Sequence, residues 1–123
     1  MKPNNPKQNS SPQRLRAFSR VDLVGDVLIH NEAELYMAPL RNLSAGGCFV
    51  SQLQNIPKGS EVKIVVRSPR LSTPIQAKGI VVRIETGKKA GLAIEFTSIP
   101  HQFRDAIQAL VYEERLQCAF KIT

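Results

Sequence analysis

The chain has 123 residues, of which 42% are apolar and 22% charged, and its net charge at pH 7 is +7. This length fits a single domain that buries a working core. No segment reaches the roughly 20 consecutive apolar residues of a membrane span, and the polar N-terminus lacks the apolar core of a signal peptide, so we expect a cytoplasmic protein.

The first 13 residues contain no apolar side chain apart from the initiator methionine and the prolines. Nothing in this stretch offsets the entropy of ordering a chain, so we predict a disordered tail over residues 1–13. Residues 1–20 carry five basic residues and no acidic one, which is +5 of the total charge. A basic arm ahead of a nearly neutral body favours an anionic partner.

From Val21 onward, apolar residues alternate with polar ones, as they do in half-buried strands with one wet face. In the segment 80–84, the alternation assigns Ile80, Val82 and Ile84 to the buried side. Short connections rich in Gly and Pro separate the segments. About six strands at this spacing indicate a mainly β fold, an antiparallel meander that closes into a six-stranded β-barrel over residues 14–98. The predicted strands cover 21–29, 35–43, 48–50, 62–67, 80–84 and 92–96.

After residue 98 the apolar period becomes helical. Phe103, Ile107, Leu110 and Val111 fall on one face, which predicts one amphipathic helix of about four turns. Residues 99–123 are thus predicted to form a C-terminal helix and tail that pack on the barrel. Two interpretations of residues 116–122 stay open: a short strand or partner-docking tail, and a frayed helix end that lies on the barrel.

Two short motifs carry most of the functional information. Arg16 and Arg20 lie four residues apart at the end of the basic arm, and Asn42, Ser44 and Gly47 lie in a polar turn between apolar segments. Guanidinium forks match phosphate oxygens and the O6/N7 edge of guanine, and an amide both donates and accepts. Glycine permits close approach of a ligand or of another chain segment. The motifs therefore indicate a site for an anionic, guanine-bearing ligand.

Each motif also has a plainer interpretation. The arginines are then a solvated basic arm. The side chains of Asn42 and Ser44 then satisfy backbone groups of their own turn, and Gly47 supplies a residue with positive φ.

The order Arg16-x-x-x-Arg20 followed by Asn42-x-Ser44-x-x-Gly47 resembles the PilZ domain, a bacterial receptor family for cyclic di-GMP. All five fixed positions of the family's pattern are filled, and the segment 91–96 resembles the family's last strand. The resemblance implies a PilZ-like barrel in which these five residues bind the ligand.

The residues just before the first motif arginine add to this resemblance. Arg14 is an additional candidate contact with the ligand. In the family, the position before the first motif arginine influences whether one ligand or a stacked pair binds. Leu15 occupies it here and favours a single ligand.

By this resemblance we expect a receptor whose arm folds over the barrel when cyclic di-GMP binds. The receptor would then signal to an effector protein. Whether it forms a homodimer is left open by the sequence. We expect no enzyme, no catalytic cofactor and no metal, because the two cysteines and two histidines form no catalytic or metal-ligating motif. One alternative is a basic-arm barrel that binds RNA or single-stranded DNA, although the chain has no Trp and few aromatic residues for base stacking. Another is a PilZ-type interaction module without ligand.

Overall fold

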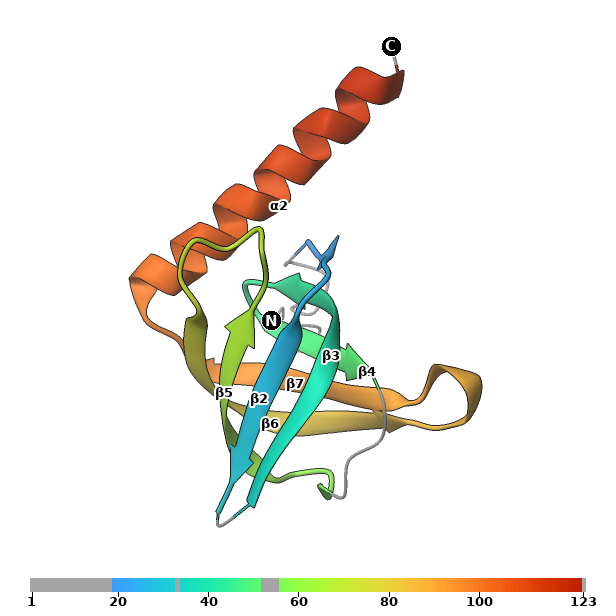
Figure 1. Ribbon diagram of the computed structural model, residues 1–123, viewed down its shortest axis with the longest axis vertical. Coiled ribbons are helices and arrows are strands. Elements are labelled where there is room, and N and C mark those ends of the chain that lie inside the picture. Colours follow the sequence, from blue (N-terminus) through green and yellow to red (C-terminus); the bar gives the residue numbers. More distant parts are fainter. Residues whose placement is uncertain (1–18, 33, 52–55, 123) are drawn as a thin grey trace, which may run out of the picture.

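The structure is a computed structural model that describes residues 19–32, 34–51 and 56–122 (Figure 1). The predicted tail over residues 1–13, together with Arg14, Leu15 and Arg16, lies outside the described residues. The strands are β1 (Val21–Asp22), β2 (Asp26–Asn31), β3 (Glu34–Ser44), β4 (Gly47–Ser51), β5 (Glu61–Arg67), β6 (Ile75–Glu85) and β7 (Gly91–Ser98). A short 3-10 helix, η1 (Gly87–Lys89), joins β6 to β7, and the helix α2 (His101–Ile122) ends the described chain.

All of the strand pairs within the described residues are antiparallel. The order in the sheet is β1-β3-β2-β5-β6-β7-β4, and an additional pairing of β3 with β4 closes the strands β2 to β7 into a ring. The prediction of a six-stranded antiparallel barrel with one C-terminal helix is therefore confirmed. The meander is not: β4 pairs with β3 and β7, so the chain crosses from β4 to β5 between strands that are not neighbours.

The barrel interior is filled by side chains that alternate along the strands, as the sequence predicts for β2 and β5. Val27 and Ile29 of β2, and Val66 of β5, are fully buried. The prediction for β6 is wrong, because the strand begins at Ile75 and buries Ile75, Ala77, Gly79 and Val81 instead of the other alternation. The run of apolar residues 80–82 fits either face, so the pattern alone does not fix which one points inward.

The first half of α2 covers one end of the barrel with the predicted apolar stripe. Ile107 and Leu110 are buried, and Phe103 and Val111 pack partly against the core. The helix then continues well beyond the predicted four turns, through residue 122, and its second half projects away from the barrel (Figure 1). The strand interpretation of residues 116–122 is wrong. Leu, Gln, Ala and Lys in this segment are good helix formers, so the helix continues without an apolar stripe.

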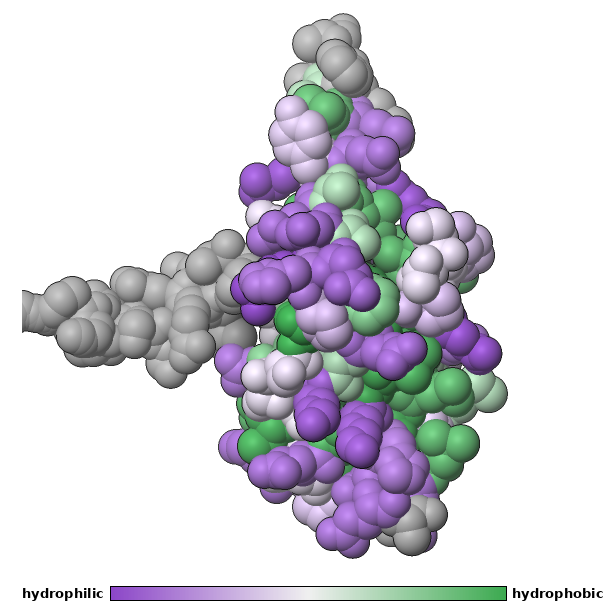
Figure 2. Space-filling view, turned by 90° about the vertical axis from the view of Figure 1, so that its left-hand side faces the viewer, coloured by the Kyte–Doolittle hydropathy of each residue, from purple (hydrophilic) through white to green (hydrophobic). Residues whose placement is uncertain are grey.

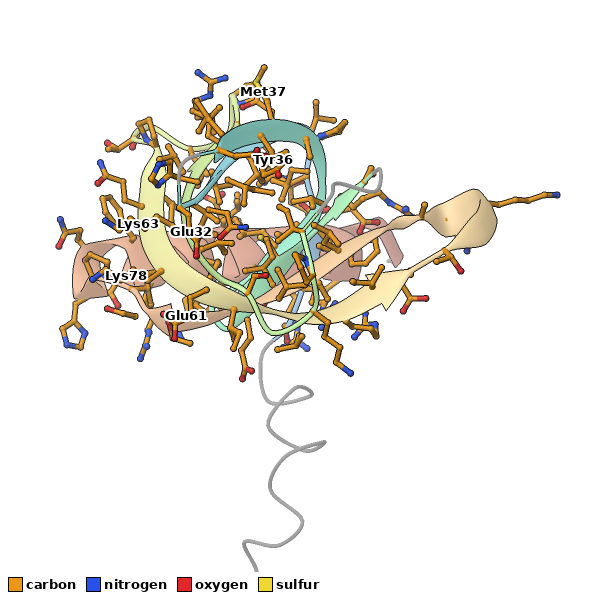
Figure 3. All side chains as sticks on the ribbon, turned by 90° about the horizontal axis from the view of Figure 1, so that it is seen from below. Glu32, Tyr36, Met37, Glu61, Lys63 and Lys78 are labelled. Atoms are coloured by element: carbon orange, nitrogen blue, oxygen red, sulfur yellow. The ribbon has the colours of Figure 1, made fainter. Side chains whose placement is uncertain are left out.

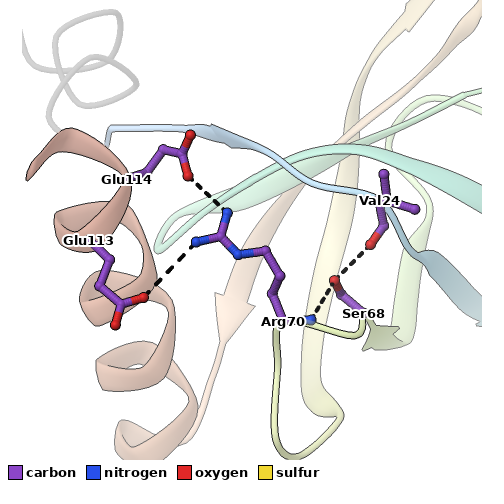
Figure 4. Close-up of polar contacts among 5 residues, drawn as sticks. All are labelled: Val24, Ser68, Arg70, Glu113 and Glu114. Carbon is purple, nitrogen blue, oxygen red and sulfur yellow. Dashed lines mark hydrogen bonds and ion pairs between the residues drawn. The ribbon is translucent and has the colours of Figure 1, made fainter. Parts of the chain in front are cut away.

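The loop between β5 and β6 joins the second half of α2 to the segment between β1 and β2 (Figure 4). Arg70 Nη1 donates to Glu114 Oε1 at 2.8 Å, and Arg70 Nη2 lies 4.0 Å from Glu113 Oε1. Ser68 Oγ donates to the carbonyl oxygen of Val24 at 2.7 Å and accepts from the backbone N–H of Arg70 at 3.3 Å. Arg70 therefore fixes the helix to the barrel beyond its last buried residue.

Replacing Arg70 with alanine is expected to loosen α2 without unfolding the barrel. Exposed ion pairs contribute at most about 1 kcal/mol, so the free energy of unfolding should fall by no more than that. Hydrogen exchange in residues 112–119 should rise clearly, since the pair anchors this segment. Arg104→Ala removes an exposed α2 arginine that forms no ion pair with another described residue. Equal exchange in both variants would contradict the anchoring role.

Candidate site at the polar turn

Asn42 lies near the end of β3, where the pairing with β4 is irregular. Leu40 pairs with Val50 and Asn42 pairs with Phe49, so Arg41 is an extra residue in β3. A β-bulge re-aims the side chains beside it. Arg41 and Asn42 therefore line the same hollow, although neighbours on a regular strand point to opposite faces.

A second β-bulge lies in β6, in its pairing with β7. Val81 pairs with Ile94 and Arg83 pairs with Ala93, which leaves Val82 as the extra residue. The bulge reverses the alternation of β6, so Arg83 is exposed instead of continuing the buried series that ends at Val81. Arg83 thereby reaches the same hollow as Asn42.

This hollow, which we call the motif pocket, has a volume of about 220 Å³. Four of its lining side chains are basic and one is acidic, so its formal charge is +3. Its floor includes the ring of Phe49, whose centroid lies 5.6 Å from the guanidinium carbon of Arg41 and 6.0 Å from that of Arg83. Arg83 Nε also donates to Glu85 at 2.5 Å. The pocket is lined by Arg20, Arg41, Asn42, Phe49, Arg83, Glu85 and Lys89.

The amide oxygen of Asn42 is the unusual atom of this pocket. It is buried, and it finds no hydrogen-bond partner among the residues that the structure describes. A buried acceptor left unpaired costs about 1–3 kcal/mol. Asn42 therefore does not satisfy its own turn with this oxygen, contrary to the plainer interpretation, and the oxygen remains available to an N–H donor.

Ser44 follows the plainer interpretation in the structure. Its hydroxyl is buried, accepts from the backbone N–H of Gly46 at 3.1 Å and donates to the carbonyl oxygen of Gly47 at 3.3 Å. These bonds close the turn between β3 and β4. The described contacts of Ser44 are thus local, and they hold the backbone on which Asn42 lies.

The plainer interpretation gave Gly47 a positive φ, and this is wrong. Close packing requires the glycine instead. The described glycines with positive φ are Gly59 and Gly87. A Cβ atom at Gly47 would lie 2.3 Å from the carbonyl oxygen of Ile94 on β7. The glycine thus lets β4 approach β7 at the start of the strand.

Arg20 comes to the same turn because β1 runs beside the end of β3, with Val21 opposite Leu43. Arg20 lines the motif pocket, and it also lines a smaller hollow of about 40 Å³ against Ser44, Gly47 and Cys48. Burial raises the pKa of the Cys48 thiol to about 12, and the charge of Arg20 partly opposes this shift. The structure therefore brings the second motif arginine to the Asn42–Gly47 turn.

The raised pKa of Cys48 predicts a loss of stability at high pH. The unfolded chain loses this proton first as the pH rises, so the stabilisation is complete below about pH 9 and is lost toward pH 12. Between pH 8 and 10.5, the wild type should lose about 2 kcal/mol more unfolding free energy than Cys48→Ala. Urea denaturation at both pH values measures the difference. Cys118→Ala, at an exposed cysteine, should behave as the wild type; equal pH dependence in all three proteins would contradict the prediction.

The sequence motifs did not identify five residues of this pocket: Arg41, Phe49, Arg83, Glu85 and Lys89. Arg41 is adjacent to the motif, but a regular strand would turn it away from Asn42. Arg83 lies in the predicted strand 80–84, and only the bulge at Val82 places it in this pocket. Lys89 ends η1, in the connection between the last two predicted strands. The signal that was available is the concentration of basic residues at these three positions.

Two further properties of the described residues limit the classes of site. They include no group of three or more His, Cys, Asp or Glu side chains placed to hold a metal ion. In the same part of the chain, no helix is both long enough and apolar enough to cross a membrane.

Comparison with known proteins agrees with this architecture. The family model of the PilZ domain matches residues 14–113. Among solved structures, the inhibitor of motility MotI (DgrA) of Bacillus subtilis superposes with a TM-score of 0.71 at 23% identity, over 81% of this chain and 51% of its own. The chain thus spans about half the length of MotI. A search of curated proteins gave no match.

Two other structures share the fold. The PilZ domain of Escherichia coli YcgR, solved with c-di-GMP, gives a TM-score of 0.61 at 13% identity, covering 85% of this chain and 95% of that one. Klebsiella pneumoniae MrkH in its apo state gives 0.64 at 15% identity, covering 84% and 52%. The fold and the polar turn define a closed antiparallel barrel with a basic pocket beside the turn. The chain belongs to the PilZ domain family.

Proposed function

We propose that this protein is a receptor for cyclic di-GMP and that the ligand binds in the motif pocket. The observation that carries the proposal is the buried, unpaired amide oxygen of Asn42 beside a pocket of net charge +3. Guanine presents N–H donors on its Watson–Crick edge and acceptors at O6 and N7, which suit an amide oxygen and arginine forks respectively. The membership of the PilZ family, and the c-di-GMP bound to the YcgR domain, support the same ligand.

The charges in the pocket fit a dianion. Arg20, Arg41 and Lys89 can neutralise phosphate oxygens, and the Arg41 and Arg83 planes lie near an aromatic ring at a spacing that suits stacking. Ser44 and Gly47 hold the turn in shape and allow β4 to close against β7. In this proposal Ser44 and Gly47 therefore act chiefly through the backbone, although the family pattern makes them candidate ligand contacts.

The N-terminal arm completes the proposed site. Arg16 would grip the ligand together with Arg20, Arg14 would lie within reach, and Leu15 favours one ligand per chain. Ordering the arm costs about 1–2 kcal/mol per residue, so several charge-assisted hydrogen bonds are needed to offset it. The ordered arm would then be recognised by an effector protein, and the receptor itself would act without catalysis.

Isothermal titration with cyclic di-GMP tests the proposal. The expected result is saturable binding of one ligand per chain, with no binding of GTP at the same concentration. A single-stranded oligonucleotide serves as a second control, since binding that falls steeply with salt would favour a nucleic-acid function instead. Absence of cyclic di-GMP binding by the folded protein would reject the receptor and leave an interaction module.

Asn42→Ala separates function from stability. The variant should bind cyclic di-GMP about tenfold more weakly, because the guanine edge loses its acceptor. Its unfolding free energy should not fall, because the substitution removes a buried acceptor that is unpaired in the free protein. Calorimetry and urea denaturation measure the two effects. A variant that is less stable but binds normally would show that Asn42 is structural.

A further inference from the structure

The outer surface of the barrel over β2, β3 and β5 carries large apolar side chains. Leu35 and Met37 of β3 are 66% and 58% exposed. Leu28 pairs with Met37 on one side and with Val65 on the other, so these three residues form a row across three strands. We call Leu28, Leu35, Met37 and Val65 the apolar face. Figure 2 shows apolar residues that reach the surface low on the barrel, between hydrophilic ones.

The apolar face is not part of the barrel core. The neighbours of Leu28 and Val65 along the chain, such as Ile29 and Ile64, point inward and are buried. A strand that is apolar on both faces is typical of a sheet that is covered on both sides. Here the described residues leave Leu35 and Met37 exposed. A second layer of secondary structure normally covers such a surface.

Basic residues border this face along the next row of the sheet. His30 pairs with Leu35 on one side and with Lys63 on the other, and Lys63 pairs with Lys78. Like charges directly opposite each other destabilise a sheet. Neither lysine lies within 4.0 Å of a carboxylate in the described part of the chain. The row therefore carries two lysine charges that form no ion pair with a described residue, and Glu61 lies two residues from Lys63 on the side away from the apolar face.

The opposite border of the face is neutral. Arg67 Nε donates to Asp26 Oδ1 at 2.8 Å, and its Nη2 donates to the sulfur of Met37 at 3.6 Å. Seen from the lower end of the barrel, Met37, Lys63 and Lys78 follow one another around the outside of the sheet (Figure 3). His30, Lys63 and Lys78 also line a hollow of about 470 Å³. A ligand that covers the face would thus meet positive charge along one side.

We propose that the apolar face docks an amphipathic helix of a partner protein, with apolar residues on one side and Asp or Glu residues along its edge. A helix is one of the elements that cover the face of a sheet, and the lysines favour acidic flanks. An anionic membrane fits less well, because its broad charged surface would also meet Glu32 and Glu61, which lie beyond His30 and Lys63 as seen from the apolar face. A second copy of this chain fits less well too, because a symmetric pairing would bring two lysine rows together.

This surface is separate from the motif pocket. Met37 and Asn42 lie on the same strand five residues apart, a span of about 17 Å at the usual rise of a β-strand. The partner helix and the proposed nucleotide can therefore bind at the same time. The inference does not depend on the nucleotide, so each can fail without the other.

A synthetic amphipathic helix of about 16 residues, with Leu on one face and Glu on its flanks, tests the inference with the full chain. Its control carries Lys in place of Glu. Binding is measured by calorimetry and mapped by amide shifts in NMR spectra of the ¹⁵N-labelled protein. We expect the acidic peptide to bind at least about tenfold more tightly than the basic one and to shift the amides of β2, β3 and β5.

Variants of the protein complete the test. Met37→Asp and Lys63→Glu should each lower the affinity for the acidic peptide about tenfold. Both should leave the affinity for cyclic di-GMP unchanged. Val24→Asp, at a site 83% exposed, and Arg115→Glu on α2 are the matched controls and should bind as the wild type. Shifts elsewhere, or equal affinity for both peptides, would overturn the inference. Two other results would also overturn it. If the protein binds phosphatidylglycerol vesicles and Met37→Asp abolishes this binding, the occupant is a membrane. If the protein dimerises and Met37→Asp abolishes the dimer, the occupant is a second copy.

Discussion

Arg20→Ala is expected to bind cyclic di-GMP at least about 30-fold more weakly than the wild type, a loss of about 2 kcal/mol. Arg20 directly precedes β1 and lines both the motif pocket and the small hollow beside Ser44, so it lies at the turn. Removing it takes away a planar set of donors that can grip a phosphate with two bonds. Arg16→Ala should have a similar effect, because Arg16 is the other arginine of the motif. Calorimetric titration of each purified variant measures the loss.

Two controls separate the geometry of Arg20 from its charge. Arg20→Lys keeps the charge but lacks the fork, so its affinity should fall between those of the wild type and Arg20→Ala. Arg115→Ala removes an equal charge from the exposed second half of α2 and should leave the affinity unchanged. Unchanged affinity in both Arg16→Ala and Arg20→Ala would reject the arm as part of the site, even if cyclic di-GMP still binds the barrel.

Sequence reasoning succeeds where charged side chains mark the outward face of a strand. Val27 and Ile29 of β2 are apolar and inward, and the acidic Asp22 and Asp26 mark the other side of the first segment. The same holds for β5, where Lys63 and Arg67 point outward. Because a shift of one residue would bury these charges, the alternation fixes the face. It fails in β6, because residues 80–82 are all apolar and the charge that marks the face, Arg83, lies beyond the bulge at Val82.

The composition of the candidate site was predictable only in part, and the bulges explain why. Asn42 and Arg20 belong to motifs whose residue types already point to an anionic guanine ligand. Arg41 and Arg83 reach the pocket because one extra residue in β3 and one in β6 break the alternation. A bulge depends on how two strands far apart in the sequence pair, which a single-strand pattern does not contain. The full length of α2 was not predicted either. Its second half is held by the ion pair of Arg70 and not by an apolar stripe, and this pair joins residues far apart in the sequence.

Gly47→Ala should cause the largest loss of stability among the substitutions considered, about 3 kcal/mol or more. The added methyl would lie 2.3 Å from the carbonyl oxygen of Ile94. This oxygen belongs to the backbone of β7, and β4 is paired to β7 along its whole length, with Gly47 opposite Glu95. Neither strand can move away without breaking hydrogen bonds of the ladder.

Gly59→Ala is the matched control for Gly47→Ala. Gly59 has φ of +93° and open space around the position of a Cβ atom, so its substitution tests conformational strain without a clash. We expect it to cost about 1 kcal/mol. Urea denaturation with a spectroscopic readout compares the two variants. If Gly47→Ala is as stable as Gly59→Ala but binds cyclic di-GMP poorly, the glycine acts on the ligand directly. If Gly47→Ala instead loses stability and saturating ligand restores part of it, the role of Gly47 is in the packing of β4 on β7. The restoration is expected because ligand binding stabilises the folded state by mass action.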